Sequence, residues 1–281
     1  MVEAWRSTLL DADRDPAFIS LALSLPGYSV LEQEFHPVPV DALLQAQDLH
    51  RQTLARACRE ELLNLYDRHA RELAARPHAR TPRDTGMRSL RNHCLSLLAE
   101  SSDPAMARTA LEQYKNATCM SDAMGALSAL THTTTPEREE VLRLFAGRWS
   151  GNPVVMNAWF GVQAISRRED TLDRVEALLT HPEFDLRNPN KVRSLLVTFA
   201  ASNPLRFHEA GGRAYAFFAD RLLQVDAINS HMGAAMVRQL MNWKRHEPRR
   251  SALLKAQLER VAAHAGLSPN AFEIASKSLE A

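Results

Sequence analysis

Glycine, cysteine and aromatic residues are all scarce in this chain of 281 residues, which contains 10 Gly, three Cys and 6% Phe, Trp and Tyr. So few glycines and aromatics argue against a turn-rich β protein. The odd number of widely spaced cysteines argues against a disulfide framework and indicates buried, reduced thiols. No apolar run reaches the roughly 18 residues that a membrane-spanning helix needs, and no secretory leader is recognised, so a cytoplasmic location is predicted.

An excess of charge of one sign is also missing. The 34 Lys and Arg residues nearly balance the 33 Asp and Glu residues, and the net charge is +1. A nucleic-acid binder needs a basic surface stripe, so neither a nucleic acid nor a membrane is predicted as a partner. Hydrophobic residues at 45% and charged residues at 24% are typical of a folded globular protein.

Helical periodicity is the main pattern that is present. From residue 41 to residue 66, apolar residues recur at intervals of three and four, which predicts a long amphipathic helix or two helices separated by a kink. Residues 25–40 contain three prolines and are predicted to form an ordered connector rather than a helix. The other helices are predicted at about 4–10, 15–24, 82–100, 104–115, 119–131, 136–149, 153–165, 171–180, 189–201, 212–227, 230–245, 248–264 and 269–280.

Many of these helices are preceded by a capping residue and a proline. Asn, Asp, Ser or Thr can cap a helix, and proline fits its first turn, where no backbone N–H is needed. From residue 104 a pair of helices recurs about every 35 residues, within the range of helical repeats. The predicted fold is therefore all-α, an α-solenoid of antiparallel helix pairs like a HEAT or armadillo superhelix, with an irregular helical bundle as the alternative. The starts are Thr81-Pro82, Asp103-Pro104, Thr135-Pro136, Asn152-Pro153, Asn188-Pro189 and Ser268-Pro269.

Motifs of catalysis and metal binding are missing. A zinc peptidase carries His-Glu-x-x-His on a helix, which places both imidazoles on one face. His208-Glu209 and His246-Glu247 each lack the second histidine and are followed by Gly or Pro. Neither a nucleophile motif nor a phosphate or dinucleotide loop occurs. No catalytic residue, no metal ligand and no cofactor is predicted in this chain.

Four blocks of sequence resemble one known family. They are Arg88–Asn92, Met120–Leu130, Val155–Ala164 and the segment from Asn188-Pro189-Asn190-Lys191-Val192-Arg193 to Phe207-His208. In order and separation they resemble the C-terminal helical domain of bacterial aminopeptidase N, a zinc-dependent enzyme that removes N-terminal residues from peptides. The resemblance implies a single helical domain over 1–281, with a candidate N-terminal subregion at 1–40 and a solenoid at 41–281. The family's catalytic domain, with its zinc, is expected upstream and is absent here.

The resemblance also implies a function and site residues. In the family this domain encloses the active-site cavity, limits substrate access and supports the catalytic domain. Arg193 matches an arginine that faces the cavity, and Asn190 belongs to the same motif. A second cavity arginine of the family aligns near Ala235, where this chain has no charge, so Arg238 one turn later is the candidate to replace it. The partners implied are the catalytic domain of the same polypeptide and, in the full-length enzyme, peptide substrates.

Two alternatives remain open from the residues alone. Arg193 can equally be a structural arginine that pairs with a carboxylate inside the solenoid. The chain can also be a free-standing α-solenoid scaffold that binds a peptide or protein on its concave face.

Overall fold

The protein is described here from a computed structural model, which covers residues 2–11, 14–76, 81–100 and 103–280. All regular elements in these residues are helices, and the only β pairing among them is an isolated bridge between Val38 and His246. The predicted all-α class is confirmed. The chain divides into two compact units, which are described separately: unit 1 comprises Met1–Pro26 with Gln45–Arg148, and unit 2 comprises Gly27–Leu44 with Trp149–Ala281.

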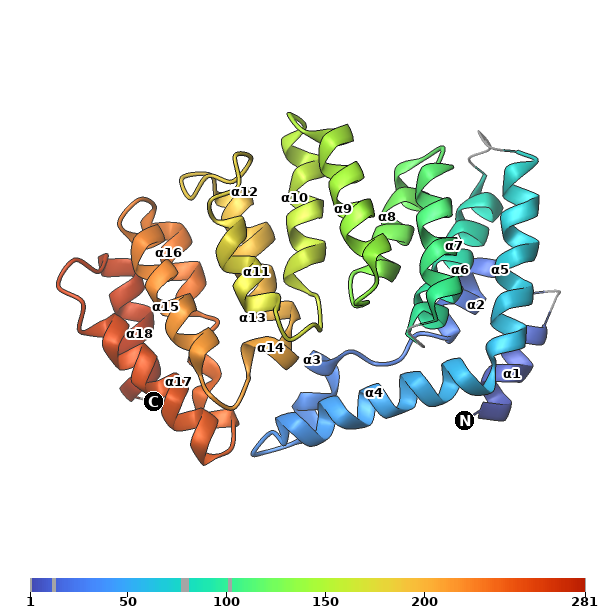
Figure 1. Ribbon diagram of the computed structural model, residues 1–281. Helices are drawn as coiled ribbons and strands as arrows, with labels where there is room; N and C mark the ends of the chain where they lie inside the picture. Colours follow the sequence, from blue (N-terminus) through green and yellow to red (C-terminus); the bar gives the residue numbers. More distant parts are fainter. Residues whose placement is uncertain (1, 12–13, 77–80, 101–102, 281) are drawn as a thin grey trace. The chain divides into compact units, whose positions relative to one another are not determined.

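Unit 1 is built from neighbouring helices that pack in pairs (Figure 1). Its central helices pack α5 against α6, α6 against α8 and α7 against α8. Helix α2 approaches α6 closely at Gly86, where a Cβ atom would lie 2.9 Å from the backbone nitrogen of Ala17. The helices are α1 (Val2–Leu10), α2 (Pro16–Ala22), α4 (Val40–Ala57, from Gln45 onward), α5 (Arg59–Ala74), α6 (Pro82–Ala99), α7 (Pro104–Lys115), α8 (Met120–Leu130) and α9 (Pro136–Trp149).

For the periodic stretch from residue 41 to residue 66, the sequence predicts either one long helix or two helices separated by a kink. The structure contains two helices. The break falls at Cys58, whose φ and ψ of −112° and 23° lie outside the helical region. Arg6 donates from Nη2 to the carbonyl of Ala57 at 2.6 Å and from Nε to Glu61 at 2.6 Å. The bond to Ala57 satisfies a carbonyl that the end of α4 leaves without a helical partner.

The cysteines are free thiols, as predicted, but only two of the three are buried. Cys58 and Cys94 are enclosed, and burial raises the pKa of the Cys94 thiol to about 12. Cys119 is partly exposed because it lies at the N-cap position of α8, at the end of the helix.

Helix starts follow the local sequence. At α6 the hydroxyl of Thr81 accepts from the amide of Asp84 at 3.2 Å, and the Asp84 carboxylate accepts from the amide of Thr81 at 3.1 Å. This capping box satisfies two amides that the helix leaves free. The side chains of Asp103 and Asn152 likewise accept from the first amides of α7 and α10, so these predicted starts are confirmed.

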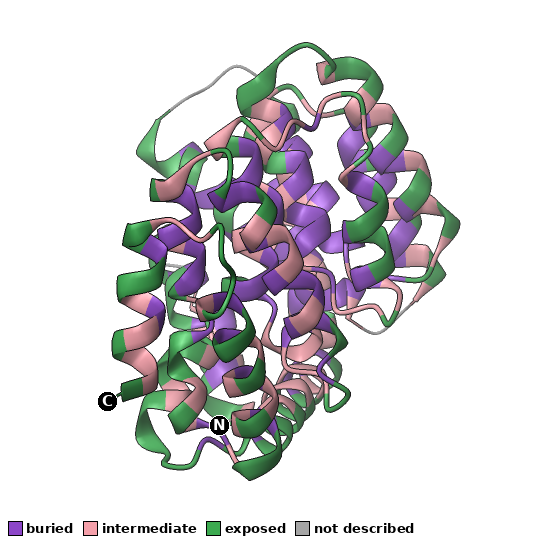
Figure 2. Ribbon diagram, turned by 90° about the vertical axis from the view of Figure 1, so that its left-hand side faces the viewer, coloured by how far each residue is buried: buried purple, intermediate pink, exposed green. Residues whose placement is uncertain are grey.

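Unit 2 continues the pattern of packed helices. Helix α15 packs against α16 and α17, and α18 packs against the same two helices. Figure 2 shows buried residues on the helix faces that meet neighbours. Helix α4 contributes its first turn, Val40–Leu44, to this unit. The helices are α3 (Tyr28–Leu31), η1 (Glu32–Glu34), α10 (Pro153–Ala164), α11 (Thr171–Leu178), α12 (Pro189–Val192), η2 (Arg193–Val197), α13 (Thr198–Ser202), α14 (Pro204–Phe207), α15 (Arg213–Asp226), α16 (Ser230–Val237), η3 (Met241–Arg245), α17 (Pro248–Ala262) and α18 (Pro269–Glu280).

Within the predicted connector at 25–40, the structure contains the short helices α3 and η1. Gly27, in an extended conformation, precedes α3, and the prolines at 37 and 39 lie beyond η1, where they prevent a longer helix. The amide of Val38 donates to the carbonyl of Arg245 at 2.7 Å, which fixes the end of the connector to η3. Among the residues described, no helix is long and apolar enough to cross a membrane.

Candidate functional site

The segment from Asn188 begins with the predicted cap. The side chain of Asn188 accepts from the amide of Asn190 at 3.0 Å, and Pro189 occupies the first helical position. Because proline has no N–H to leave unsatisfied and a preset φ, this start is favoured locally. The segment therefore begins where its sequence predicts.

The helix that follows differs from the single helix expected at 189–201. Residues Arg193–Val197 form a π-helical segment, η2, between α12 and α13. The hydroxyl of Thr198 donates to the carbonyl of Arg193 at 3.0 Å, five residues back. The widened turn lies where η2 packs against α10, at the close approach of Gly161 to the carbonyl of Ser194. Single π turns are rare and occur frequently at functional sites.

Arg193 and Asn190 lie together on the exposed side of this segment. Nη1 of Arg193 donates to Oδ1 of Asn190 at 3.4 Å, a long hydrogen bond, and both residues are exposed. Arg193 has no carboxylate partner among the described residues, so the structural ion pair considered as its alternative role is absent there.

Arg238 occupies a different place. It is the exposed C-cap residue of α16, and within the described parts of the chain it forms no hydrogen bond with Asn190 or Arg193. The structure thus brings together two of the three predicted cavity residues. No geometry assigns Arg238 to the same site.

The buried side of the segment is fixed by aromatic packing. Nζ of Lys191 lies 5.0 Å from the ring centroid of Phe160, and burial lowers the pKa of this lysine. Phe160 in turn packs edge-on against Trp159 and Phe184, with centroids 5.2 and 5.6 Å away. Trp159 and Phe160 are buried core residues, and their packing gives the exposed Arg193 a rigid support.

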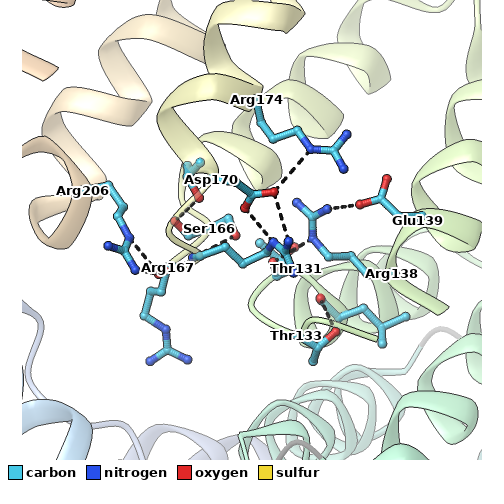
Figure 3. A network of polar contacts seen from close by, with 12 residues as sticks. Thr131, Thr133, Arg138, Glu139, Ser166, Arg167, Asp170, Arg174 and Arg206 are labelled. Carbon is cyan, nitrogen blue, oxygen red and sulfur yellow. Dashed lines mark hydrogen bonds and ion pairs between the residues drawn. The ribbon is translucent and has the colours of Figure 1, made fainter. Parts of the chain in front are cut away.

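Hydrogen bonds fix the far end of the segment to the turn after α10 (Figure 3). Nδ2 of Asn203 donates to the carbonyls of Ala164 and Ser166 at 2.9 and 2.7 Å. Arg206 donates from Nε and Nη2 to the carbonyl of Arg167 at 2.8 and 2.5 Å, a contact visible in Figure 3. Both ends of the segment around Arg193 are therefore held to α10 or to the turn that follows it.

A second polar cluster in unit 2 escaped the sequence reasoning. The histidines of the two incomplete zinc motifs, His208 and His246, lie with their ring centroids 4.6 Å apart. Nδ1 of His208 is 2.7 Å from the hydroxyl of Tyr215. Burial, the neighbouring His246 and Arg250 lower the pKa of His208 to about 3, and burial also lowers the pKa of His246. Both rings are neutral at pH 7, and sequence spacing alone contains no signal for a pair separated by 38 positions.

Arg250 forms hydrogen bonds with this cluster and with two carboxylates. Its Nη1 and Nη2 donate to the two oxygens of Asp41 at 3.1 and 2.7 Å, Nη1 also donates to Glu247 at 3.1 Å, and Nε donates to the carbonyl of His208 at 2.6 Å. The nearby cavity is about 130 Å³ and is too small for most organic ligands. The described residues contain no group of three or more His, Cys, Asp or Glu that could hold a metal ion. Arg250 thus links His208, Glu247 and Asp41 in one hydrogen-bonded cluster.

The helical repeats define an ARM-repeat protein, and the comparisons give its family. Residues 1–280 match the sequence profile described as "Domain of unknown function (DUF3458_C) ARM repeats", and the chain belongs to this family. Over 279 residues, 99% of this chain, it is 37% identical to aminopeptidase N of Caulobacter vibrioides and 31% identical to aminopeptidase N of Escherichia coli. The resemblance to the C-terminal helical domain of bacterial aminopeptidase N is confirmed.

Two further facts bound what these relatives show. The chain spans about a third of their length, 32% in both cases. The crystal structure of Legionella pneumophila aminopeptidase A in complex with aspartic acid superimposes with a TM-score of 0.87 at 24% identity, covering 99% of this chain and 33% of that one. That likeness establishes the fold alone.

Proposed function

We propose that this chain is the non-catalytic C-terminal domain of a zinc-dependent aminopeptidase N, in which it encloses the active-site cavity, limits substrate access and supports the catalytic domain. The observation that carries the proposal is similarity along 99% of this chain to about a third of two aminopeptidases N. The zinc and the catalytic residues belong to the remaining two thirds. The partners are that catalytic domain and, in the complete cytoplasmic enzyme, peptide substrates.

Within this domain we assign Arg193, with Asn190, to the cavity. An exposed guanidinium without a carboxylate partner, on a segment anchored at both ends, offers a fixed positive charge. That charge binds the carboxylate at the C-terminal side of a peptide substrate or a carboxylate of the catalytic domain. Arg238 is a weaker candidate because no contact links it to this pair.

The first test asks whether this chain alone has the zinc-dependent peptidase activity of the complete enzyme. The 281-residue chain alone should bind no stoichiometric zinc and should not hydrolyse alanyl p-nitroanilide, whereas the complete polypeptide should do both. Zinc-dependent turnover by the pure chain would refute the proposal. Tight binding of peptides by the chain alone, with no zinc-binding region encoded upstream, would establish the free-standing scaffold instead.

The second test addresses Arg193 in the complete enzyme. Arg193→Gln should raise the KM for tetra-alanine about three- to tenfold, the loss expected for one solvent-accessible charged hydrogen bond. If Arg193 binds the substrate carboxylate, the C-terminal amide of tetra-alanine should show no such change. An equal change for both substrates would indicate that Arg193 pairs with a carboxylate of the catalytic domain instead.

Arg187→Gln is the matched control, because Arg187 is an exposed arginine of the same region that already pairs with Asp185 at 3.1 Å. If it raises KM as much as Arg193→Gln, the site assignment is wrong.

A further inference from the structure

A cavity of about 500 Å³ lies among α5, α6, α7 and α8 of unit 1. This volume falls in the range of pockets that bind small organic ligands, about 300–1,000 Å³. Five charged side chains line it: Arg88, Arg91, Arg108, Glu112 and Asp122. Three cations face two carboxylates, 3 − 2 = +1, so the lining has one positive charge in excess.

Two of these arginines are buried, and they share one carboxylate. Nη2 of Arg91 lies 2.6 Å from Oδ1 of Asp122, and Nε of Arg88 lies 3.5 Å from Oδ2. Arg91 and Asp122 are 7% and 5% exposed. Because an arginine stays protonated in proteins, a buried guanidinium needs anionic or carbonyl acceptors to offset its lost hydration.

Arg91 lacks a full set of such acceptors. Within the described residues, neither its Nε nor its Nη2 forms an aligned hydrogen bond, so the 2.6 Å contact with Asp122 is an ion pair without hydrogen-bond geometry. His69 nearby adds no acceptor charge: burial and then Arg68, Arg83 and Arg91 lower its pKa to about 4, which leaves it neutral at pH 7. A second anion would complete the coordination of Arg91.

A second buried residue that lines the same cavity has an unused acceptor. Nε2 of Gln113 donates to the carbonyl of Asp122 at 3.0 Å and to Oδ1 of Asn92 at 2.8 Å, which fixes the amide. Its Oε1 accepts no hydrogen bond from the residues that the structure describes. Gln113 is 9% exposed and also lines the cavity. Arg91 and Gln113 therefore converge on Asp122, one with an unused donor and the other with an unused acceptor.

We propose that this cavity binds a carboxylate with a neighbouring amide N–H, the carboxylate on Arg91 and the N–H on Oε1 of Gln113. Both groups occur in an N-acylated amino acid and at the C-terminus of a peptide. The inference concerns unit 1 and does not depend on the proposed function.

Isothermal titration of the 281-residue chain tests it with four probes. N-acetylalanine or trialanine should bind with one-to-one stoichiometry, and the tighter of the two identifies an acylated amino acid or a peptide terminus as the source. N-acetylalanine methylamide, which lacks the carboxylate, should not bind. Inorganic phosphate that binds as tightly as both carboxylates would overturn the assignment, and so would the absence of binding by N-acetylalanine and trialanine.

Variants locate the binding. Arg91→Gln should weaken it by about tenfold or more, as expected for a hydrogen bond to a charged group. Arg143→Gln, a change of an exposed arginine in α9, should leave it unchanged. Thr109→Trp fills the cavity and breaks only a bond within its own helix, from the hydroxyl to the carbonyl of Ala105. It should abolish binding even if Arg91→Gln does not fold, and undiminished binding by a folded Thr109→Trp protein would refute the site.

Discussion

The two units bury arginine in contrasting ways. In unit 2, Arg250 donates four hydrogen bonds, to Asp41, Glu247 and the carbonyl of His208. In unit 1, the one carboxylate that Arg91 meets among the described residues is that of Asp122, which also pairs with Arg88. A buried guanidinium whose acceptors are all supplied by the chain stabilises the fold, whereas one that lacks acceptors next to a cavity favours an anionic ligand.

The largest expected effect is that of removing the shared carboxylate. Asp122→Asn should lower the free energy of unfolding by about 3–5 kcal/mol, because two buried arginines lose their common counter-charge. Asp41→Asn should cost about 1 kcal/mol or less, since the Asp41 side chain is 65% exposed and Arg250 keeps its other acceptors. Urea unfolding of both variants measures this difference. Equal losses would show that the two arginine clusters do not differ as described.

Two glycines, Gly125 in unit 1 and Gly233 in unit 2, allow the helix packing of the two units to be compared. A Cβ at Gly233 would lie 2.7 Å from the Cα of Asp226, and one at Gly125 would lie 2.3 Å from Cγ of Asn92. Gly233→Ala and Gly125→Ala should each lower the free energy of unfolding by about 1–3 kcal/mol. The loss should be larger for Gly233→Ala, because the backbone of Asp226 must move. Gly147→Ala in α9, where nothing lies within 4 Å, should stabilise by about 0.5–1 kcal/mol. Thermal unfolding reports all three, and a destabilised Gly147→Ala would contradict the packing argument.

Lowering the pH should reveal the contribution of the histidine cluster of unit 2 to stability. The folded pKa of His208, about 3, lies below the ordinary value of about 6.5, so the unfolded chain binds more protons between these values. Stability contributed by neutral His208 is complete above pH 6.5 and is lost as the pH falls from 6.5 toward 3. The parent protein should lose unfolding free energy as the pH falls from 7 to 5, and in His208→Gln this loss should be smaller by about 1 kcal/mol. The difference is smaller than a fully buried histidine would give, because His208 is partly exposed.

Denaturant titrations at both pH values measure this change, with His231→Gln, an exposed histidine of unit 2, as the control. An identical pH dependence in the His208→Gln protein and the parent would remove the cluster as an acid-sensitive element.

The smallest effect is expected at the candidate site itself. Arg193→Ala should change the free energy of unfolding by no more than about 0.5 kcal/mol, because the side chain is exposed and its hydrogen bond to Asn190 is long. Chemical denaturation checks it. A loss above 2 kcal/mol would make Arg193 a structural residue of unit 2 and would favour the structural alternative considered from the sequence.

The predicted helix starts depended on short-range signals. Thr81, Asp103, Asn152 and Asn188 each cap a helix that begins at the following proline, because a cap needs only the two or three residues that come next. The π turn at Arg193 could not be predicted in this way. It lies where Ser194 contacts Gly161 of another helix, a contact that local sequence does not encode.

The sequence by itself determined the helical class, most helix boundaries and the family, since each depends on local periodicity, on caps or on the order of motifs. It also drew attention to Asn190 and Arg193, which belong to one motif. Only the tertiary structure decided that the rings of His208 and His246 meet, that Arg91 meets Asp122 beside a cavity and that Arg238 does not join Arg193. The physical reason is that charge pairing and burial depend on distance in space, and residues 31 or 38 positions apart in the chain approach one another only when helices pack.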